Sequence, residues 1–159
     1  MQRITPCLWF NDNAEAAVKL YTSIFKNSKV TAVTHYGEAG ARASGRPVGT
    51  VMTITFQLEG LQFMALNGGP HFTFSPAISL VANCKTQKDI DRLWRKLGAG
   101  GRIDHCGWLQ DKFGVSWQIV PADIGKMVQD SRDGKAERVM QAILGMRKID
   151  LATLKRATR

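Results

Sequence analysis

The sequence contains Gly60-Leu-Gln-Phe-Met-Ala-Leu-Asn67 and, further along, Gly114-Val-Ser-Trp-Gln-Ile-Val-Pro121, two stretches that repeat one pattern. In each, a glycine suited to a tight turn precedes a short run of apolar and polar residues that is typical of a strand. Phe63 of the first stretch aligns with Trp117 of the second. The repetition indicates that this part of the fold is built twice.

A helical segment also occurs twice. Residues 13–21 return as residues 86–94, each led by a residue that can cap a helix and each ending in a leucine followed by an aromatic residue. Asn13 and Thr86 are the predicted N-caps, because their side-chain oxygens can accept hydrogen bonds from the first helical turn. A duplicated half-domain predicts a pseudo-symmetric cavity lined by equivalent positions of the two copies.

The apolar pattern gives the order β-α-β-β-β twice, followed by helical periodicity. We expect a single α+β domain over 1–159, in which modules 3–67 and 77–121 form a concave mixed sheet and 122–159 form a helical tail. Predicted strands are 4–10, 28–36, 50–58, 61–67, 77–84, 102–105, 106–111 and 115–120; predicted helices are 14–25, 86–97, 123–130, 134–145 and 150–157.

The stretch 37–49 lengthens the first module relative to the second. It holds four glycines and Pro47, a composition that favours loops over regular structure. We therefore expect a long mobile connection that acts as a flexible flap over the cavity.

Composition narrows the class of protein. Of the 159 residues, 44% are hydrophobic and 22% charged, as in ordinary globular domains. No apolar run reaches the roughly 20 residues of a transmembrane helix, and the N-terminus lacks the layout of a signal peptide. Three irregularly spaced cysteines argue against a disulfide framework. We expect a cytoplasmic protein with reduced thiols and no membrane association.

The net charge of +9 raises the alternative of nucleic-acid binding. Residues 126–159 hold nine Lys or Arg and four Asp or Glu, so much of the excess lies in the predicted tail. No zinc finger or aromatic-basic stripe accompanies it. A solvated basic helix explains the charge better, and we do not expect nucleic acid as a partner.

Four segments carry a resemblance to a known family: Ile4–Phe10, Tyr21–Phe25, Ala65–His71 and Cys106–Pro121. The chain resembles the vicinal oxygen chelate superfamily of glyoxalase I, fosfomycin and bleomycin resistance proteins and extradiol dioxygenases, and most closely its PhnB-like branch. The resemblance runs essentially end to end, including the tail. It implies paired βαβββ modules and a homodimer. Some members of this branch carry the label of a ubiquinone-pathway methyltransferase.

In the metal-dependent members of the superfamily, four histidine or glutamate ligands come from four strands. The resemblance maps these positions to Thr5, Met64, Ala77 and Gln118. A divalent ion in such a site requires imidazole or carboxylate donors, which these four residues do not supply. We therefore expect no metal and no other cofactor. The three histidines of the chain lie elsewhere, at His35, His71 and His105.

Strand parity predicts the cavity lining, because alternate residues of a strand share one face. Phe63 and Trp117 then point away and pack beneath the helices. The predicted ligand pocket comprises Thr5, Cys7, Trp9, Gln62, Met64, Leu66, Ser79, Trp108, Ser116 and Gln118. A mostly apolar lining with aromatic, amide and hydroxyl groups suits a small organic molecule.

No residue set stands out for catalysis. A catalytic thiol needs a depressed pKa, and His105 would point to the face opposite Cys106 on a strand. Asp12, Glu59 and Asp111 fall at turns or caps, where carboxylates are normally solvated. The glycine-rich stretch lacks the GxGxxG spacing, so it gives no support for S-adenosylmethionine binding.

We therefore expect a metal-free small-molecule-binding protein of the PhnB-like type, with its catalytic residues, if any, unknown. The alternative is an enzyme that acts on a small metabolite through Gln118, Thr5 or a cysteine. A weaker alternative is nucleic-acid binding through the basic tail, which steep salt dependence would reveal. Apolar positions in the tail fit a dimer interface and packing within one chain equally well.

Overall fold

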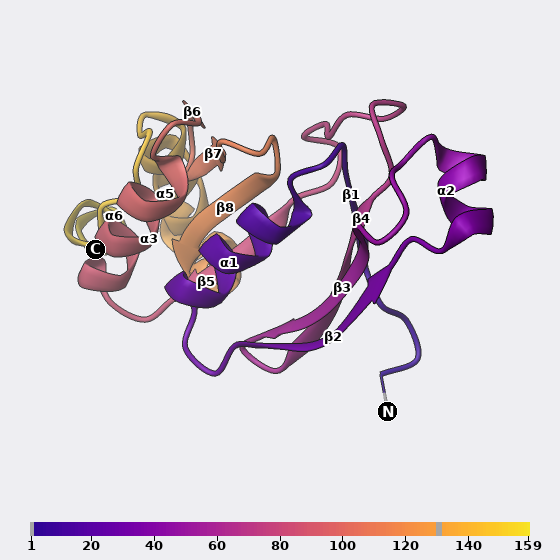
Figure 1. The fold of residues 1–159 in the computed structure, drawn as a ribbon. Coiled ribbons are helices and arrows are strands. Elements are labelled where there is room, and N and C mark those ends of the chain that lie inside the picture. The colour runs from indigo at the N-terminus through magenta and orange to yellow at the C-terminus, as the bar shows by residue number, and fades with distance from the viewer. Residues whose placement is uncertain (1, 130–131) are drawn as a thin grey trace. The chain divides into compact units, whose positions relative to one another are not determined.

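The computed structural model describes residues 2–129 and 132–159. The chain divides into two compact units, Met1–Phe74 and Ser75–Arg159, and Figure 1 traces the elements of each. Each unit contains one βαβββ module with its own four-stranded mixed sheet. The predicted α+β class and the two modules are confirmed, whereas the single domain stays a prediction.

The first unit consists of β1 (Cys7–Phe10), α1 (Ala14–Ile24), β2 (Lys29–His35), α2 (Glu38–Ser44), β3 (Val51–Leu58) and β4 (Leu61–Asn67). Its strand order is β1-β4-β3-β2, with β1 parallel to β4 and the other pairs antiparallel. Helix α1 packs on β3 and β4 and buries Ala17, Val18 and Tyr21. Phe56 and Phe63 stack beneath it at 5.5 Å between ring centroids.

The second unit begins with β5 (Leu80–Cys84), α3 (Gln87–Gly98), β6 (Arg102–Ile103), β7 (Trp108–Gln110) and β8 (Ser116–Pro121). Its strand order, β5-β8-β7-β6, repeats that of the first unit. Helix α3 packs on β5, β7 and β8 and buries Ile90, Leu93 and Leu97. Trp117 is 3% exposed, so it lies in the core as predicted.

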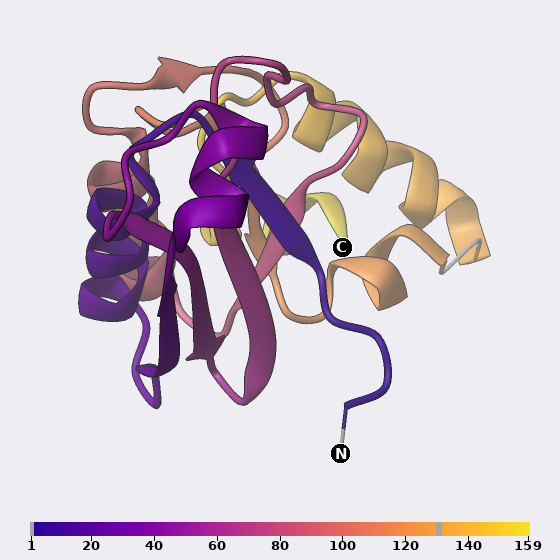
Figure 2. The same ribbon diagram turned by 45° about the vertical axis from the view of Figure 1, so that its right-hand side comes forward.

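The tail consists of α4 (Ile124–Gln129), η1 (Arg132–Gly134), α5 (Lys135–Leu144) and α6 (Leu151–Ala157). The predicted helix over 123–130 includes residue 130, which lies outside the described residues. Helices α4 and α5 lie side by side (Figure 2). Val139, Ile149 and Leu154 are buried within the chain, so packing inside the chain accounts for these apolar residues. None of the helices in the described ranges is long and apolar enough to cross a membrane.

The glycine-rich stretch is not an irregular connection, and that prediction is wrong for residues 38–44, which form α2. Its glycines lie mainly at the helix ends: Gly37 is the N-cap, and Gly45 ends the helix with φ of 69° while its N–H donates to Ala41 O. Glycine is the residue that most often takes this left-handed conformation at the end of a helix. Gly40 lies inside the helix, where a Cβ would stand 3.2 Å from the Tyr36 ring.

Four strands, β1, β5, β6 and β7, are shorter than predicted by two residues or more at one end, and β6 ends at Ile103 instead of residue 105. Strand β1 begins at Cys7 and β5 at Leu80, so Thr5, Ala77 and Ser79 precede strands rather than lie in them. Strand β7 begins only at Trp108. The physical reason for the last is a bend at residues 106–107, where both backbone φ angles are positive.

Candidate functional site

One face of the first sheet is covered by α1, and the other, which we call the first open face, is not. Cys7 stands opposite Met64 and Trp9 opposite Leu66 across β1 and β4. Facing residues of paired strands point to the same side. These side chains are exposed or half-buried, whereas their neighbours along the strands are buried. The predicted lining residues that share the first open face are therefore Cys7, Trp9, Gln62, Met64 and Leu66.

Trp9 is held firmly on this face. Its indole N–H donates to Gly69 O at 3.0 Å, and Phe72 meets the ring edge-on at 4.9 Å between centroids. A Cβ at Gly68 would lie 2.2 Å from the indole, so only glycine allows the ring to lie there. The segment after β4 thus fixes an aromatic wall beside Leu66.

Asn67 positions this segment and was missed by the sequence analysis. It is 2% exposed. Its Oδ1 accepts a hydrogen bond from Ala14 N–H at 2.9 Å, while its Nδ2 donates to Glu15 Oε2 at 2.7 Å and to Val51 O at 3.1 Å. Its carbonyl accepts from the Tyr36 hydroxyl at 2.6 Å. One amide therefore joins α1, β3 and the end of β4.

The predicted cap of α1 is accordingly wrong. Asn13 makes no side-chain cap hydrogen bond, because Asn67 reaches the first turn from the sheet. The signal was present in strand parity: Asn67 falls on the same side of β4 as Phe63 and Ala65, which are buried. A polar residue on a buried face requires hydrogen-bond partners.

The second sheet has a similar open face, opposite α3. Gln118 stands between Val81 on β5 and Trp108 on β7. The Gln118 Nε2 donates to Ser79 Oγ at 2.9 Å, which ties the segment before β5 to this face. Ser116 shares the same parity but is only 4% exposed.

Asp111 is not the solvated turn carboxylate that the sequence suggested. It is 3% exposed. Its Oδ1 accepts hydrogen bonds from the N–H groups of Phe113 at 2.9 Å and Val115 at 3.1 Å, and its Oδ2 accepts from Trp117 Nε1 at 2.9 Å. The carboxylate stabilises the turn between β7 and β8 and orients a core tryptophan. This structural role removes it as a candidate general base.

At the four positions that the family resemblance assigns to metal ligands, the residues present do not suit a divalent ion. Ala77 has no donor, Thr5 offers a neutral hydroxyl, and Met64 offers a soft thioether, none of them suited to a hard or borderline divalent ion. The Nε2 of Gln118 donates to Ser79 Oγ, and the remaining carbonyl oxygen is a single neutral donor rather than an imidazole or a carboxylate. Across residues 2–129 and 132–159, no group of three or more His, Cys, Asp or Glu side chains is arranged to hold a metal ion.

The thiols are poorly suited to nucleophilic chemistry. Burial, with a smaller contribution from the Asp89 carboxylate, raises the pKa of Cys84 to about 11. Partial burial also raises the pKa of Cys7. The thiolate is the reactive form, so both shifts lower reactivity near neutral pH. Cys106 lies at the bend before β7, where its N–H donates to Met146 O at 2.8 Å.

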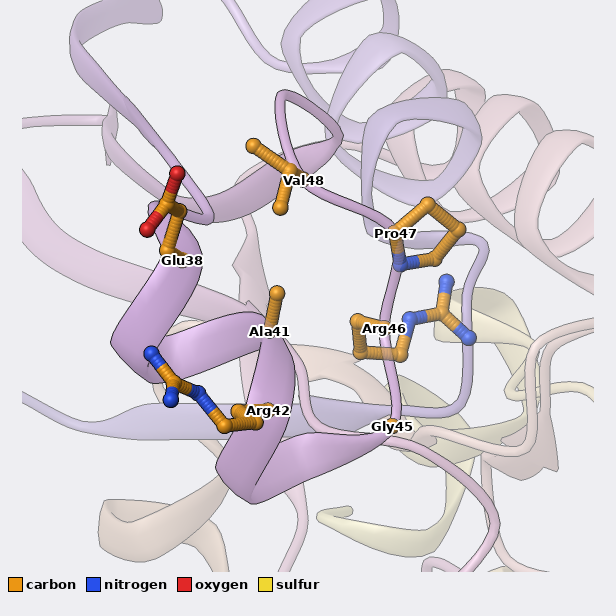
Figure 3. A pocket seen from close by; sticks show the side chains of 7 residues that line it. All are labelled: Glu38, Ala41, Arg42, Gly45, Arg46, Pro47 and Val48. Carbon is orange, nitrogen blue, oxygen red and sulfur yellow. The ribbon is translucent and has the colours of Figure 1, made fainter.

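A shallow pocket that is wide open to the surface, outside the predicted lining, lies on the loop between β2 and β3 (Figure 3). Its volume is about 810 Å³. The lining residues are Glu38, Ala41, Arg42, Gly45, Arg46, Pro47 and Val48. The composition of this stretch predicted a flexible flap, so the sequence did not indicate a pocket that depends on α2.

Comparison with known proteins identifies the family. The family model described as 3-demethylubiquinone-9 3-methyltransferase matches residues 2–120. The structure of a PhnB protein from Bacillus cereus is 38% identical over 76% of this chain and 100% of that chain, with a TM-score of 0.68. The chain belongs to this PhnB-like family.

Two more distant structures match this PhnB-like protein, and the first of them is similar in fold. Protein PA1353 from Pseudomonas aeruginosa is 22% identical over 74% of this chain and 95% of that chain, with a TM-score of 0.59. A glyoxalase/bleomycin resistance protein from Albidiferax ferrireducens T118 is 14% identical over 73% of this chain and 95% of that chain, with a TM-score of 0.43. No curated protein gives a significant match. The resemblance was expected to include the helical tail. The family match ends at residue 120, so it does not extend into the tail.

Proposed function

We propose that this PhnB-like protein binds a small, largely apolar or aromatic molecule without a metal ion, against the open faces of its sheets. The observation that carries the proposal is the fixed Trp9 ring, locked by its bond to Gly69 O and by Phe72. Next to it lie the half-buried side chains of Met64 and Leu66. A rigid aromatic group beside aliphatic and thioether groups favours flat apolar ligands.

The second open face supports the same ligand class. Trp108 offers an aromatic surface beside Gln118. The Gln118 Nε2 bond to Ser79 fixes the amide orientation and leaves its carbonyl oxygen as an acceptor for a ligand hydroxyl or N–H group. We also infer a homodimer, on the strength of the family resemblance. Thr5 and Ser116 remain in the proposed lining as polar neighbours.

Methyl transfer is not part of the proposal. The family description names a methyltransferase, but α2 is a helix of only seven residues that follows β2, an exposed edge strand. Cofactor cradles of the dinucleotide type instead place a glycine turn between a buried parallel strand and a long helix. Nothing in the loop 37–49 supplies that arrangement.

Ligand binding can be tested by NMR on protein treated with a chelator and labelled at its methionine methyl groups. Titration with indole, a neutral aromatic probe, is expected to shift the Met64 methyl and the Trp9 indole N–H signals saturably. The methyl of Met140, exposed on α5, serves as the internal control and should not move. The variant Met64→Gln should weaken binding by roughly fivefold, because it replaces apolar contact area with an amide.

Equal shifts at Met64 and Met140, or shifts that never saturate, would overturn the proposal. An enzyme would be distinguished by its response to Gln118→Ala. If a turnover assay with a candidate metabolite shows activity that this variant abolishes while its unfolding curve is unchanged, catalysis through cavity groups replaces simple binding.

A further inference from the structure

The first open face continues from β4 onto β3, beyond the residues considered so far (Figure 1). On β3, Thr53, Thr55 and Gln57 are half-buried, and each is followed by a buried apolar residue. Alternate residues of a strand point to opposite sides of the sheet. The register identifies the side, because Thr53 stands opposite Leu66 and Thr55 opposite Met64 across β3 and β4. The polar residues of β3 therefore belong to the first open face.

Strand pairing orders the side chains of this face into rows that run across the sheet. Two successive rows are Trp9, Leu66, Thr53 and Thr34, and then Cys7, Met64, Thr55 and Ala32. Neighbouring strands lie about 4.8 Å apart, and successive rows lie about 6.6 Å apart. The face is therefore mainly apolar over β1 and β4 and carries hydroxyl groups over β3, one strand away.

The hydroxyl of Thr53 is already bonded within the protein. Its Oγ1 lies 2.6 Å from Thr34 Oγ1, and Thr34 Oγ1 also accepts a hydrogen bond from Thr53 N–H at 3.2 Å. This pair lies beside an irregular place in the pairing of β2 and β3, between Thr34 and His35. Thr53 is thus a threonine of the first open face whose hydroxyl has a structural partner.

The hydroxyl of Thr55 is different. The carbonyl of Thr55 accepts from Thr31 Oγ1 at 3.1 Å, but its own hydroxyl has no partner in the described ranges 2–129 and 132–159. The Oγ1 atom is accessible at the surface. Its neighbours in the row, Met64 and Ala32, are not strong hydrogen-bonding groups. One donor and two acceptor positions are therefore available to a molecule that lies on this face.

The charge of the surroundings favours a neutral ligand. The face positions placed above on β1, β4 and β3 carry no acidic or basic side chain, and burial raises the pKa of the Cys7 thiol, which keeps it neutral. Lys29 stands opposite Gln57 on β2, the outermost strand, and is exposed. A charged group placed beside Met64 would lose hydration without gaining a partner.

We propose that the ligand of the first open face is a neutral aromatic molecule with an oxygen substituent, and that Thr55 selects it by a hydrogen bond to that oxygen. The inference rests on the proposed function and keeps its apolar contacts with Trp9, Leu66 and Met64. A ring that lies on Met64 and Leu66 places a substituent about 5 Å away, over Thr55. The substituent is a phenolic hydroxyl or a ring carbonyl, because a threonine hydroxyl can bond to either.

Three probes of similar size test this selection: indole, 5-hydroxyindole, and oxindole, which carries a ring carbonyl. Each is titrated into chelator-treated full-length protein, and the dissociation constant is taken from the shift of the Met64 methyl signal. At least one oxygenated probe is expected to bind about fivefold more tightly than indole, which corresponds to one hydrogen bond. Tighter binding of 5-hydroxyindole would assign a hydroxyl ligand, and tighter binding of oxindole would assign a carbonyl ligand.

Variants assign the gain to one hydroxyl. Thr55→Val replaces the hydroxyl with a methyl group and should abolish the fivefold gain without changing the affinity for indole. Thr55→Ser keeps the hydroxyl and should retain most of the gain. Thr53→Val makes the same change on the same face, at a hydroxyl bonded to Thr34, and should leave the gain in place. A gain that survives in Thr55→Val, or that falls equally in Thr53→Val, would overturn the proposal.

Failure of this inference differs from failure of the proposed function. If indole shifts the Met64 methyl signal saturably and neither oxygenated probe binds more tightly, selection by Thr55 is wrong and the proposed function stands. If none of the three probes produces a saturable shift, the proposed function is wrong and the inference fails with it.

Discussion

The helices α1 and α3 occupy equivalent places in the two modules, yet their first turns are held in different ways. For α3, Thr86 Oγ1 accepts from Asp89 N–H at 3.1 Å and donates to Asp89 Oδ2 at 2.8 Å, all within one turn. For α1, the capping hydrogen bond comes from the side chain of Asn67, which is the last residue of β4. One module begins its helix with a local contact, and the other begins it with a contact between distant parts of the chain.

The hairpin turns of the two modules also differ in how their acidic residues are held. Glu59 is exposed at the turn between β3 and β4, whereas Asp111 is buried at the turn between β7 and β8 and accepts three hydrogen bonds. Each module therefore depends on a buried, hydrogen-bonded polar residue at a different place, Asn67 at the end of β4 and Asp111 at the turn after β7. A duplicated pattern in sequence does not imply that the polar contacts are duplicated.

The largest expected effect is the loss of the Asn67 side chain. Asn67→Ala removes an acceptor from Ala14 N–H and a donor from Val51 O, and we expect a loss of about 3 kcal/mol in the free energy of unfolding, because buried polar groups are left unpaired. Urea denaturation measures it. Asn13→Ala is the matched control and should cost less than about 0.5 kcal/mol. If the two variants lose equal stability, the local cap matters as much as the distant one.

Removal of the Asp111 carboxylate should come next. Asp111→Ala is expected to cost about 2 kcal/mol, since Trp117 Nε1 and two backbone N–H groups lose their acceptor. Asp111→Asn keeps one carbonyl oxygen for the backbone and should cost about half as much. Glu59→Gln at the exposed turn should leave the unfolding midpoint unchanged. An Asp111→Ala variant as stable as Glu59→Gln would contradict the comparison of the turns.

The local cap of α3 should have a smaller effect. Thr86→Ala is expected to lower the free energy of unfolding by about 1 kcal/mol, the typical value for a lost N-cap. Thr86→Ser keeps the hydroxyl and should retain nearly all the stability, as thermal denaturation of the two variants can show. A loss from Thr86→Ala as large as that from Asn67→Ala would remove the distinction between the two helix starts.

The smallest effect concerns pH. The pKa of Cys84 is raised to about 11 by burial, so its contribution to stability is fully present below the ordinary thiol pKa and is lost as the pH rises toward 11. Near pH 8, Cys84 holds roughly 100-fold less thiolate than an unperturbed cysteine. Iodoacetamide labelling followed by mass spectrometry should therefore modify Cys7 well before Cys84. Equal labelling rates of Cys7 and Cys84 would show that burial does not protect the Cys84 thiol.

Much of the fold could be predicted because its signals are local. Turn glycines, strand alternation and helical periodicity gave both modules, and parity placed Cys7, Met64 and Gln118 on the uncovered sides of their sheets. The predictions that were wrong concern features that depend on contacts between residues distant in the sequence. The cap by Asn67 spans 53 positions. The helix α2 formed because its glycines sit at its ends and against the Tyr36 ring, which composition alone does not reveal.

The central claim, a metal-free binding protein, is tested most directly by native mass spectrometry of the purified protein, followed by the same sample under denaturing conditions. The account predicts a dimer whose mass carries no metal ion, together with any small organic molecule that dissociates on denaturation. A stoichiometric divalent metal would contradict it, because Thr5, Met64, Ala77 and Gln118 could not then be the positions that correspond to the metal ligands of related proteins.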